Sequence, residues 1–328
     1  MNFSQQLKKP FIKPVLLSVV ACFLWGIIFF APLFLENFCC IDIVLGRYFF
    51  YGILSLSFLI FFFIKNETDF LSYWKQALLC ALVMNLGYFS ALVLGIRLSD
   101  PFLITLIVGL APMVITIVSC WKDQKEKLNF SLVFPALSIF LGLVMMNVQI
   151  IQTKWDQLSW LEYVEGIACG LISLAAWTWY VIFNNHLLKK NPDLNPHHWT
   201  ILIGVMTLFI AIMGIGIRWF WIADEEMHLF SFEVEGKLFF AISLTLGVVC
   251  SWLAFTLWNL GSAHLPAKIS GQLSILETLF GLLFIYSIKL QWPTILEVAG
   301  ILCILAGISG SLILHYRESE PVQTTSDV

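Results

Sequence analysis

The feature that most constrains this chain is a succession of apolar runs separated by short charged segments. A helix of about 20 apolar residues crosses the hydrocarbon core of a bilayer. Because lipid offers a backbone no hydrogen-bond partners, runs of this length predict helices. We place ten runs at 14–35, 43–64, 76–96, 101–121, 130–150, 162–184, 199–219, 238–260, 265–287 and 294–316.

The composition agrees with a protein embedded in lipid. Hydrophobic residues make up 59% of the 328 residues and charged residues 12%, about half the charged share of a soluble domain. The net charge of -3, without a basic stripe, argues against nucleic-acid binding. The eight cysteines show no metal or redox spacing, so no metal, cofactor or disulfide framework is expected. We predict an all-α, polytopic membrane protein that contacts membrane lipids.

The basic residues predict the orientation of the chain. Twelve of the 18 Lys and Arg residues fall on the side of the N-terminus, which predicts that both termini are cytoplasmic. No clear cleavage site follows the first run, so we expect a retained helix rather than a signal peptide. We therefore expect a multi-pass protein of the cytoplasmic (inner) membrane.

Two stretches of the sequence share one order of features. Gly87–Pro112 and Leu253–Glu277 both run from aromatic residues through a glycine and a turn with proline to an apolar helix. At an offset of 166 residues, the matched pairs are Gly95 with Gly261, Phe89 with Phe255 and Leu94 with Leu260. Trp25 in the first run also resembles Trp177 in the sixth.

This pattern predicts a repeat of five helices. The units are 1–155 and 156–316, followed by a disordered cytoplasmic tail at 317–328. Because five is odd, consecutive units enter the membrane from opposite sides. Such inverted repeats are typical of secondary transporters, which bind substrate near the midplane where the repeats meet.

Short motifs in both halves resemble the drug/metabolite transporter superfamily, specifically its EamA-type ten-helix permeases. The residues that carry the resemblance are Trp25-Gly26, Arg47, Leu110-Ala111-Pro112, Trp177, Leu276-Glu277 and Gly307. The family often has Glu-Pro in the ninth span, whereas Glu277 is followed here by Thr278. Where the family often has Gly-Glu, this chain has Trp121-Lys122 and Lys289-Leu290. The resemblance implies transport, often export, of amino acids or related small metabolites.

Glu277 is the strongest candidate for a binding group. Its nearest charged neighbours are Lys268 and Lys289, so it lies near the centre of its span. An isolated charge at this depth costs about 2.5–3.5 kcal/mol on insertion scales and normally faces a cavity or a partner. Burial favours the protonated acid and a cationic substrate favours the carboxylate, so substrate binding and proton coupling are both open, with a structural hydrogen bond as the alternative. The residues on its helix face are Ser270, Ser274 and Gly281.

Aromatic residues also lie inside the spans. Aromatic faces line pockets for apolar groups or cations, and packing between helices is the alternative. Asn85, one turn from Tyr88, either contacts substrate or joins helices. The candidate binding residues are Glu277, Trp25, Tyr88, Trp177, Asn85, Ser274, Ser270, Trp258 and Tyr180.

Other polar residues have simpler interpretations. Arg47, with Asp42 nearby, is expected to reach lipid headgroups rather than substrate. His197 and His198 are expected to be solvated beside a loop. Small residues at four-residue spacing suit close helix contact, which leaves a monomer and a homodimer both open.

The sequence lacks a catalytic motif such as H-E-x-x-H, a P-loop or G-x-S-x-G, so neither an enzyme nor an ATP-driven pump is expected. The leading hypothesis is a secondary transporter for a small metabolite, a zwitterionic or cationic amine, that alternates a central cavity between the two faces. An intramembrane lipid-modifying enzyme is the first alternative, and it would need a second titratable group facing Glu277. A non-transporting receptor or scaffold is the second, and it would have larger loops.

Overall fold

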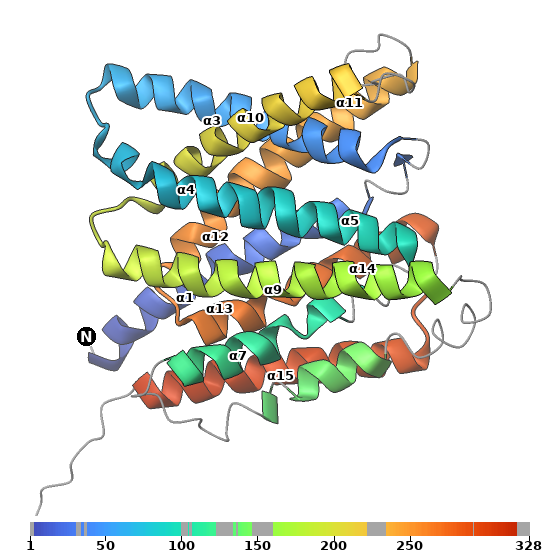
Figure 1. The fold of residues 1–328 in the computed structure, drawn as a ribbon. Helices are drawn as coiled ribbons and strands as arrows, with labels where there is room; N and C mark the ends of the chain where they lie inside the picture. The colour runs from blue at the N-terminus through green and yellow to red at the C-terminus, as the bar shows by residue number, and fades with distance from the viewer. Residues whose placement is uncertain are drawn as a thin grey trace, which may run out of the picture.

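The computed structural model describes residues 3–30, 34–35, 38–99, 104, 107–122, 134–135, 137–145, 160–221, 234–290 and 292–319. Within these ranges the regular structure is helical, without a strand, which confirms the predicted all-α class. Figure 1 shows the helices running back and forth across the molecule, with their connections at its two ends.

In chain order the elements are α1 (Phe3–Gly26), η1 (Ile27–Phe30), α3 (Cys40–Ile64), η2 (Asp69–Tyr73), α4 (Trp74–Cys80), η3 (Ala81–Tyr88), α5 (Phe89–Leu98), α7 (Ala111–Lys122), α9 (Trp160–Lys190), α10 (Pro196–Trp221), α11 (Val234–Gly247), η5 (Val248–Leu253), α12 (Ala254–Ser262), α13 (Ala267–Ser274), α14 (Leu276–Lys289) and α15 (Ile295–Ser319). The segments η3 and η5 are π-helical, whereas η1 and η2 are 3-10 helices.

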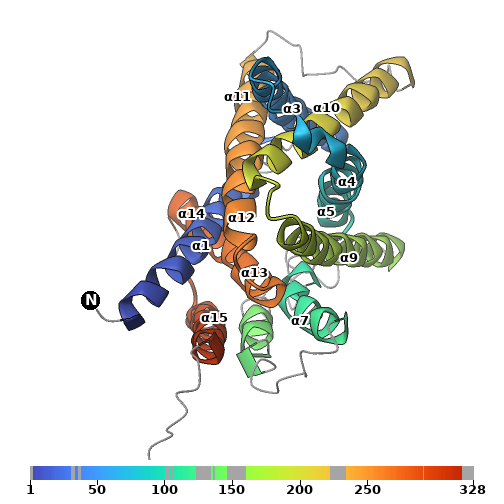
Figure 2. The ribbon, with the colours of Figure 1, turned by 90° about the vertical axis from the view of Figure 1, so that its left-hand side faces the viewer.

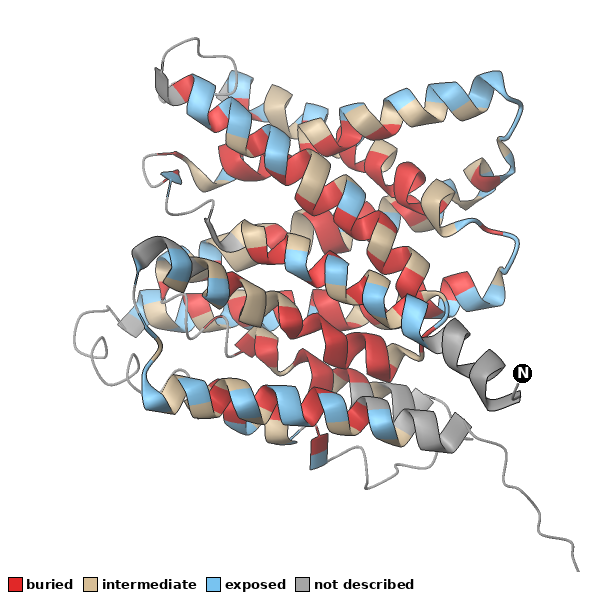
Figure 3. Cartoon of the chain, turned by 180° about the vertical axis from the view of Figure 1, so that it is seen from behind, coloured by how far each residue is buried: buried red, intermediate tan, exposed pale blue. Residues whose placement is uncertain are grey.

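Among the described residues, five helical stretches are long and apolar enough to cross a membrane: Cys40–Ile64, Asp69–Leu98, Leu161–Lys190, Pro196–Phe220 and Gly236–Ser262. The shorter apolar helices are Ile12–Gly26 and Ile295–Ser311. All seven overlap runs predicted from the sequence. Exposed side chains on the outer faces are largely apolar, as in Phe63 and Phe220, whereas buried residues gather where the helices meet (Figure 3). The chain is therefore a multi-pass membrane protein.

Helices α3 and α10 cross in close contact. A Cβ atom added at Gly204 would lie 2.6 Å from Cβ of Ser55, so only glycine allows this approach. At one end of the crossing, Nε of Arg218 lies 3.3 Å from Oδ1 of Asp42, and both side chains are almost fully buried. Asp42 thus pairs with Arg218 of α10.

Two irregularities recur in the stretches that the sequence pairs. Shifting η3 by the predicted 166 residues gives 247–254, a range that contains η5. A one-residue interruption also precedes α7 at Leu110 and α14 at Ile275. π-helical turns are rare and are frequent at functional sites. The matched positions therefore direct attention to the region between η3, η5 and the start of α14.

The helices that carry these irregularities surround one central region. Figure 2 places α1, α12 and α14 together on one side and α5 and α9 on the other. Helix α1 packs on both α12 and α14, and α5 packs on α9. The candidate site lies between these two groups.

Candidate substrate-binding site

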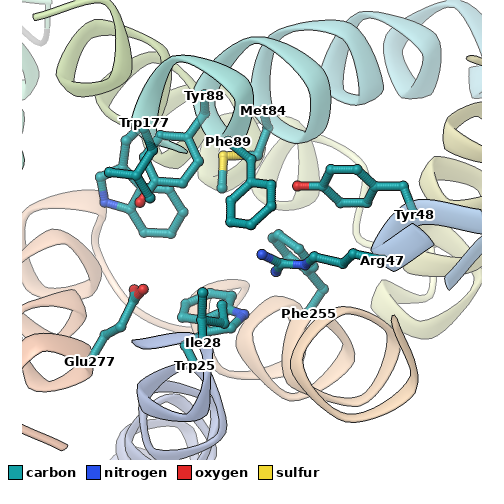
Figure 4. A pocket seen from close by; sticks show the side chains of 11 residues that line it. Trp25, Ile28, Arg47, Tyr48, Met84, Tyr88, Phe89, Trp177, Phe255 and Glu277 are labelled. Carbon is teal, nitrogen blue, oxygen red and sulfur yellow. The ribbon is translucent and has the colours of Figure 1, made fainter. Parts of the chain in front are cut away.

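The central region contains a cavity with an empty volume of about 320 Å³, which we call the first compartment. Its lining residues are Trp25, Ile28, Arg47, Tyr48, Met84, Tyr88, Phe89, Leu92, Trp177, Phe255 and Glu277 (Figure 4). A second compartment of about 520 Å³ shares Tyr88, Leu92, Trp177 and Glu277, and it adds Ile96, Val108, Gly109, Pro112, Ser274, Ile275 and Thr278. Because four residues line both, the two compartments form one site with Glu277 between them.

Glu277 lies in the first turn of α14, directly after the interruption at Ile275. A carboxylate in the first turn of a helix is stabilised by the positive end of the helix dipole. The side chain is half-buried, and it points into the first compartment from the wall opposite Arg47 (Figure 4). The other lining residues of the first compartment come from the first, second, third, sixth and eighth predicted runs. The position permits contact with a molecule in either compartment.

Arg47 lies on the wall of the first compartment and not at the headgroups, so the snorkelling expectation was wrong. It stands seven residues after the start of α3, about 10 Å along the axis, and its side chain is only 3% exposed. Nε donates to Oγ of Ser251 at 2.9 Å, and Nη2 donates to the carbonyl of Cys250 at 3.4 Å. Both acceptors belong to η5, so the π-helical segment turns the guanidinium inward.

Two features of the sequence are compatible with a place for Arg47 on the cavity wall. Arg47 lies a few residues inside its predicted span, and Glu277 is an isolated acid in the other half. The side-chain direction that joins these two facts depends on the packing of α3 against η5.

Aromatic rings form most of the cavity wall. The ring of Trp25 lies 5.6 Å from that of Trp177 and 5.2 Å from that of Phe255. Tyr88 lies 5.6 Å from Trp177, and the guanidinium carbon of Arg47 is 4.4 Å from the centre of Phe89. Such ring pairs contribute about 0.5–1.5 kcal/mol each beyond burial. The wall is therefore held in place by its own packing.

Four predicted site residues meet in the first compartment: Glu277, Trp25, Tyr88 and Trp177. Ser274 lines the second compartment, where its hydroxyl donates to the carbonyl of Gly271 at 2.7 Å. The site therefore combines aromatic faces, one carboxylate and one hydroxyl from the predicted set.

The other four predicted residues lie behind the wall or away from it. The ring of Trp258 is 5.2 Å from that of Trp25, and Tyr180 donates to Oδ1 of Asn259 at 3.3 Å. Asn85 donates to Oγ1 of Thr207 at 2.6 Å and so joins η3 to α10. The predicted residues that line neither compartment are Asn85, Ser270, Trp258 and Tyr180.

A network of buried polar groups closes one end of the bundle. Asn184 accepts from Nε1 of Trp199 at 2.7 Å and donates to Oδ1 of Asn259 at 3.0 Å. Asn259 donates to Oγ1 of Thr200 at 2.8 Å, and the hydroxyl of Tyr51 donates to the carbonyl of Thr200 at 2.9 Å. We call these five residues the polar lock. It connects α3, α9, α10 and α12 near the turn at 191–195.

The compartments lie toward the opposite end of the bundle from the polar lock. The end of α3 meets the start of α10, where the rings of Phe62 and His198 are 4.4 Å apart. Arg47 is near the other end of α3, and Ile28 follows α1 at that same end (Figures 1 and 4). The polar lock therefore lies between the compartments and the end of the bundle that carries the turn at 191–195.

His197 and His198 are not the solvated loop residues that the sequence suggested. Both are half-buried in the first turn of α10. The ring of His197 lies 5.6 Å from that of Trp252, and Nε2 of His198 lies 3.9 Å from Oε2 of Glu67. In the part of the chain that the structure describes, no group of His, Cys, Asp or Glu side chains is arranged to hold a metal ion.

Comparisons with known proteins agree with a membrane transporter. "Inner membrane protein YtfF" of Escherichia coli is 28% identical over 301 residues, which cover 90% of this chain and 94% of that protein. An "uncharacterized transporter" of Haemophilus influenzae is 33% identical over 133 residues, which cover 40% of this chain and 69% of that protein.

A solved crystal structure shares the fold, with a TM-score of 0.70 at 16% identity, over 94% of this chain and 99% of the other. The model of the EamA-like transporter family matches twice in succession, at residues 12–148 and 164–313. The two matches together include most of the chain and all eleven residues that line the first compartment. The chain therefore belongs to the EamA-like transporter family.

Proposed function

We propose that this membrane transporter is a secondary transporter for a small zwitterionic or cationic amine, an amino acid or a related metabolite. The observation that carries the proposal is the place of Glu277, a lone acid on the wall of an aromatic cavity. A carboxylate binds an ammonium group through charge-assisted hydrogen bonds. Neighbouring aromatic faces attract the same cation.

The proposed architecture is ten membrane helices in two inverted five-helix units, 1–155 and 156–316. The recurrence of the π-helical segments η3 and η5 supports this repeat. The two family matches support it too, since each falls within one unit. The distribution of basic residues supports an orientation with both termini in the cytoplasm. The name of the Escherichia coli relative supports an inner-membrane location.

In this orientation the polar lock closes the cytoplasmic side and the compartments face outward. Alternating access then requires that the lock opens while the outer end closes around the substrate. Glu277 would release the amine and take up a proton, or the reverse, which couples transport to protons. Export is the direction implied by the family resemblance. Whether the unit works as a monomer or as a homodimer does not alter this cycle.

The enzyme alternative has little support from the site. Among the described residues that line the first compartment, the charged side chain besides Glu277 is Arg47. A guanidinium remains protonated in proteins, so it does not exchange protons with Glu277 as a second acid or base would. The site therefore fits binding better than acid–base catalysis.

The test begins with purified protein and a thermal-shift screen of amino acids, polyamines and quaternary amines. A true ligand raises the melting temperature progressively as it saturates the site. Each ligand found is then assayed in proteoliposomes for counterflow, in which an unlabelled internal pool drives the uptake of labelled ligand. We expect an amine-bearing ligand to show both effects. If ligands raise the melting temperature but none of them shows counterflow, the proposal of transport is contradicted.

A further inference from the structure

The first compartment holds two opposite charges that do not neutralise each other. Figure 4 shows the guanidinium of Arg47 and the carboxylate of Glu277 pointing into the same space from opposite walls. The ion pairs among the described residues include Arg218 with Asp42, but none joins Arg47 to Glu277. Opposite charges attract strongly in a site of low dielectric constant. Something must therefore hold these two apart.

The segment η5 supplies that restraint. Arg47 donates from Nε to the side chain of Ser251 and from Nη2 to the carbonyl of Cys250, at 2.9 and 3.4 Å. The ring of Phe89 lies 4.4 Å from the guanidinium carbon, and that of Tyr48 lies 5.3 Å from it. The guanidinium is thus held on its own wall.

The contact between Ser251 and Arg47 has a counterpart in the other half of the chain. At the offset of 166 residues, Ser251 in η5 corresponds to Asn85 in η3. Asn85 reaches across to Thr207 of α10, just as Ser251 meets Arg47 of α3. Both π-helical segments therefore present a polar side chain to a helix of the other half, but only one of these contacts positions a charge.

Arg47 retains donors for a ligand. A guanidinium has five N–H donors in a planar fork. In the described part of the chain, the hydrogen bonds of Arg47 come from Nε and Nη2, which leaves both N–H groups of Nη1 and one of Nη2. Arginine is suited to bidentate binding of a carboxylate. An anionic group in the compartment would meet these N–H groups.

We propose that Arg47 is the anion-binding residue of the site and that the substrate class is narrowed to dipolar ions. The anionic group of the substrate binds Arg47, its ammonium binds Glu277, and its apolar body lies on the rings of Trp25, Tyr88 and Trp177. This inference rests on the proposed function. It adds that an amine alone fills only half of the site, so the pair of charges determines specificity.

The test uses the purified full chain and four related probes: L-phenylalanine, its methyl ester, its N-acetyl derivative and 2-phenylethylamine. The ester and the amine lack the carboxylate, whereas the N-acetyl acid lacks the ammonium group. Affinities are measured by titrated thermal shift and counterflow. For the wild type we expect L-phenylalanine to bind at least about tenfold more tightly than each other probe, since a hydrogen-bonded charge is worth that factor or more.

The variants separate the two charges. Arg47→Gln should reduce the affinity for L-phenylalanine to that of its ester. The affinities for the ester and the amine should change by less than about twofold. Arg47→Lys keeps the charge without the fork, so it should retain part of the preference for the acid over the ester. Arg97→Gln is the matched control, because Arg97 lies outside both compartments and donates to the carbonyl of Phe38. It should leave all four affinities unchanged.

Two results would overturn the role of Arg47 while leaving the proposed function intact. One is equal binding of the acid, its ester and the amine by the wild type. The other is an undiminished preference for the acid in Arg47→Gln, or in Arg47→Lys if the glutamine variant does not fold. If none of the four probes binds or shows counterflow, the inference fails. The proposed function itself then stands or falls with the wider screen described above.

Discussion

The guanidinium of Arg47 and the carboxylate of Glu277 face each other across one cavity, yet Arg47 is bonded to Ser251 and Cys250 instead. Another buried pair is in direct contact, since Nε of Arg218 lies 3.3 Å from Oδ1 of Asp42. A direct pair joins two helices, whereas a separated pair leaves space for a ligand between its charges. In our proposal, the direct pair has a structural role and the separated pair binds the substrate.

The pair Asp42–Arg218 should matter for stability and little for transport specificity. Removing one partner of a buried ion pair leaves the other charge uncompensated and costs about 3–5 kcal/mol. We expect Asp42→Ala to lower the free energy of unfolding by that order, measured by denaturation in detergent. The double variant Asp42→Leu/Arg218→Met should recover much of the loss. An Asp42→Ala protein as stable as the wild type would show that the pair is not a structural contact.

The crossing of α3 and α10 should depend on Gly204. A methyl group there collides with the backbone-proximal Cβ of Ser55, and overpacking of this kind costs about 1–3 kcal/mol. Gly216, on the same helix, has no atom within 4 Å of an added Cβ, so Gly216→Ala should be neutral or slightly stabilising. The melting temperatures of the two variants test this difference. Equal effects would contradict the close crossing.

The polar lock should control access from the cytoplasmic side. Ser270 is fully buried on the helix face that leads to Glu277. In a cysteine-free background, we expect Ser270→Cys to be protected from an impermeant thiol reagent. Adding Asn184→Ala, which removes the partner of Trp199 and Asn259, should increase the rate of labelling in inside-out vesicles.

Two results would contradict this account of the lock. Labelling that increases only from the outside would reverse the proposed orientation. An unchanged rate on both sides would show that Asn184 does not hold the bundle closed. The variant Asn191→Ala provides a control, because Asn191 lies in the adjacent turn and bonds to Tyr73 outside the lock.

Much of the fold follows from the sequence because membrane crossing is a matter of length and polarity. The run at 43–64 becomes α3, and the run at 199–219 becomes α10, each within a few residues. The isolation of Glu277 and the recurrence of tryptophan at 25 and 177 likewise identified residues that meet in the cavity. These signals need no knowledge of which helix packs on which.

The remaining parts of the site depend on packing, which single-sequence patterns do not contain. Arg47 turns inward because η5 offers two acceptors more than 200 residues later. Asn85 and Ser274 are both polar residues inside predicted spans. In the structure Asn85 donates to Thr207, so it joins helices and does not line the cavity. In the sequence Asn184 is an amide near a loop, without a distinguishing feature. The structure shows that it bonds to Trp199 and Asn259.

The central claim is that the carboxylate of Glu277 acts in transport, and one substitution tests it. Glu277→Gln keeps the shape and hydrogen-bonding capacity of the side chain but removes its ionisation. Glu297→Gln is the matched control, because Glu297 accepts a hydrogen bond from the backbone N–H of Thr294 on the exposed start of α15, away from both compartments.

The decisive measurement is counterflow of the ligand found by the thermal-shift screen, recorded for both variants across a pH series. We predict that Glu277→Gln reduces counterflow to the background of empty liposomes at every pH, with expression and melting temperature nearly unchanged, while Glu297→Gln transports normally. A purely structural glutamate would instead tolerate Gln, and Ala would lower stability by about 1–3 kcal/mol through an unsatisfied partner. Normal counterflow by Glu277→Gln across the series would contradict the account.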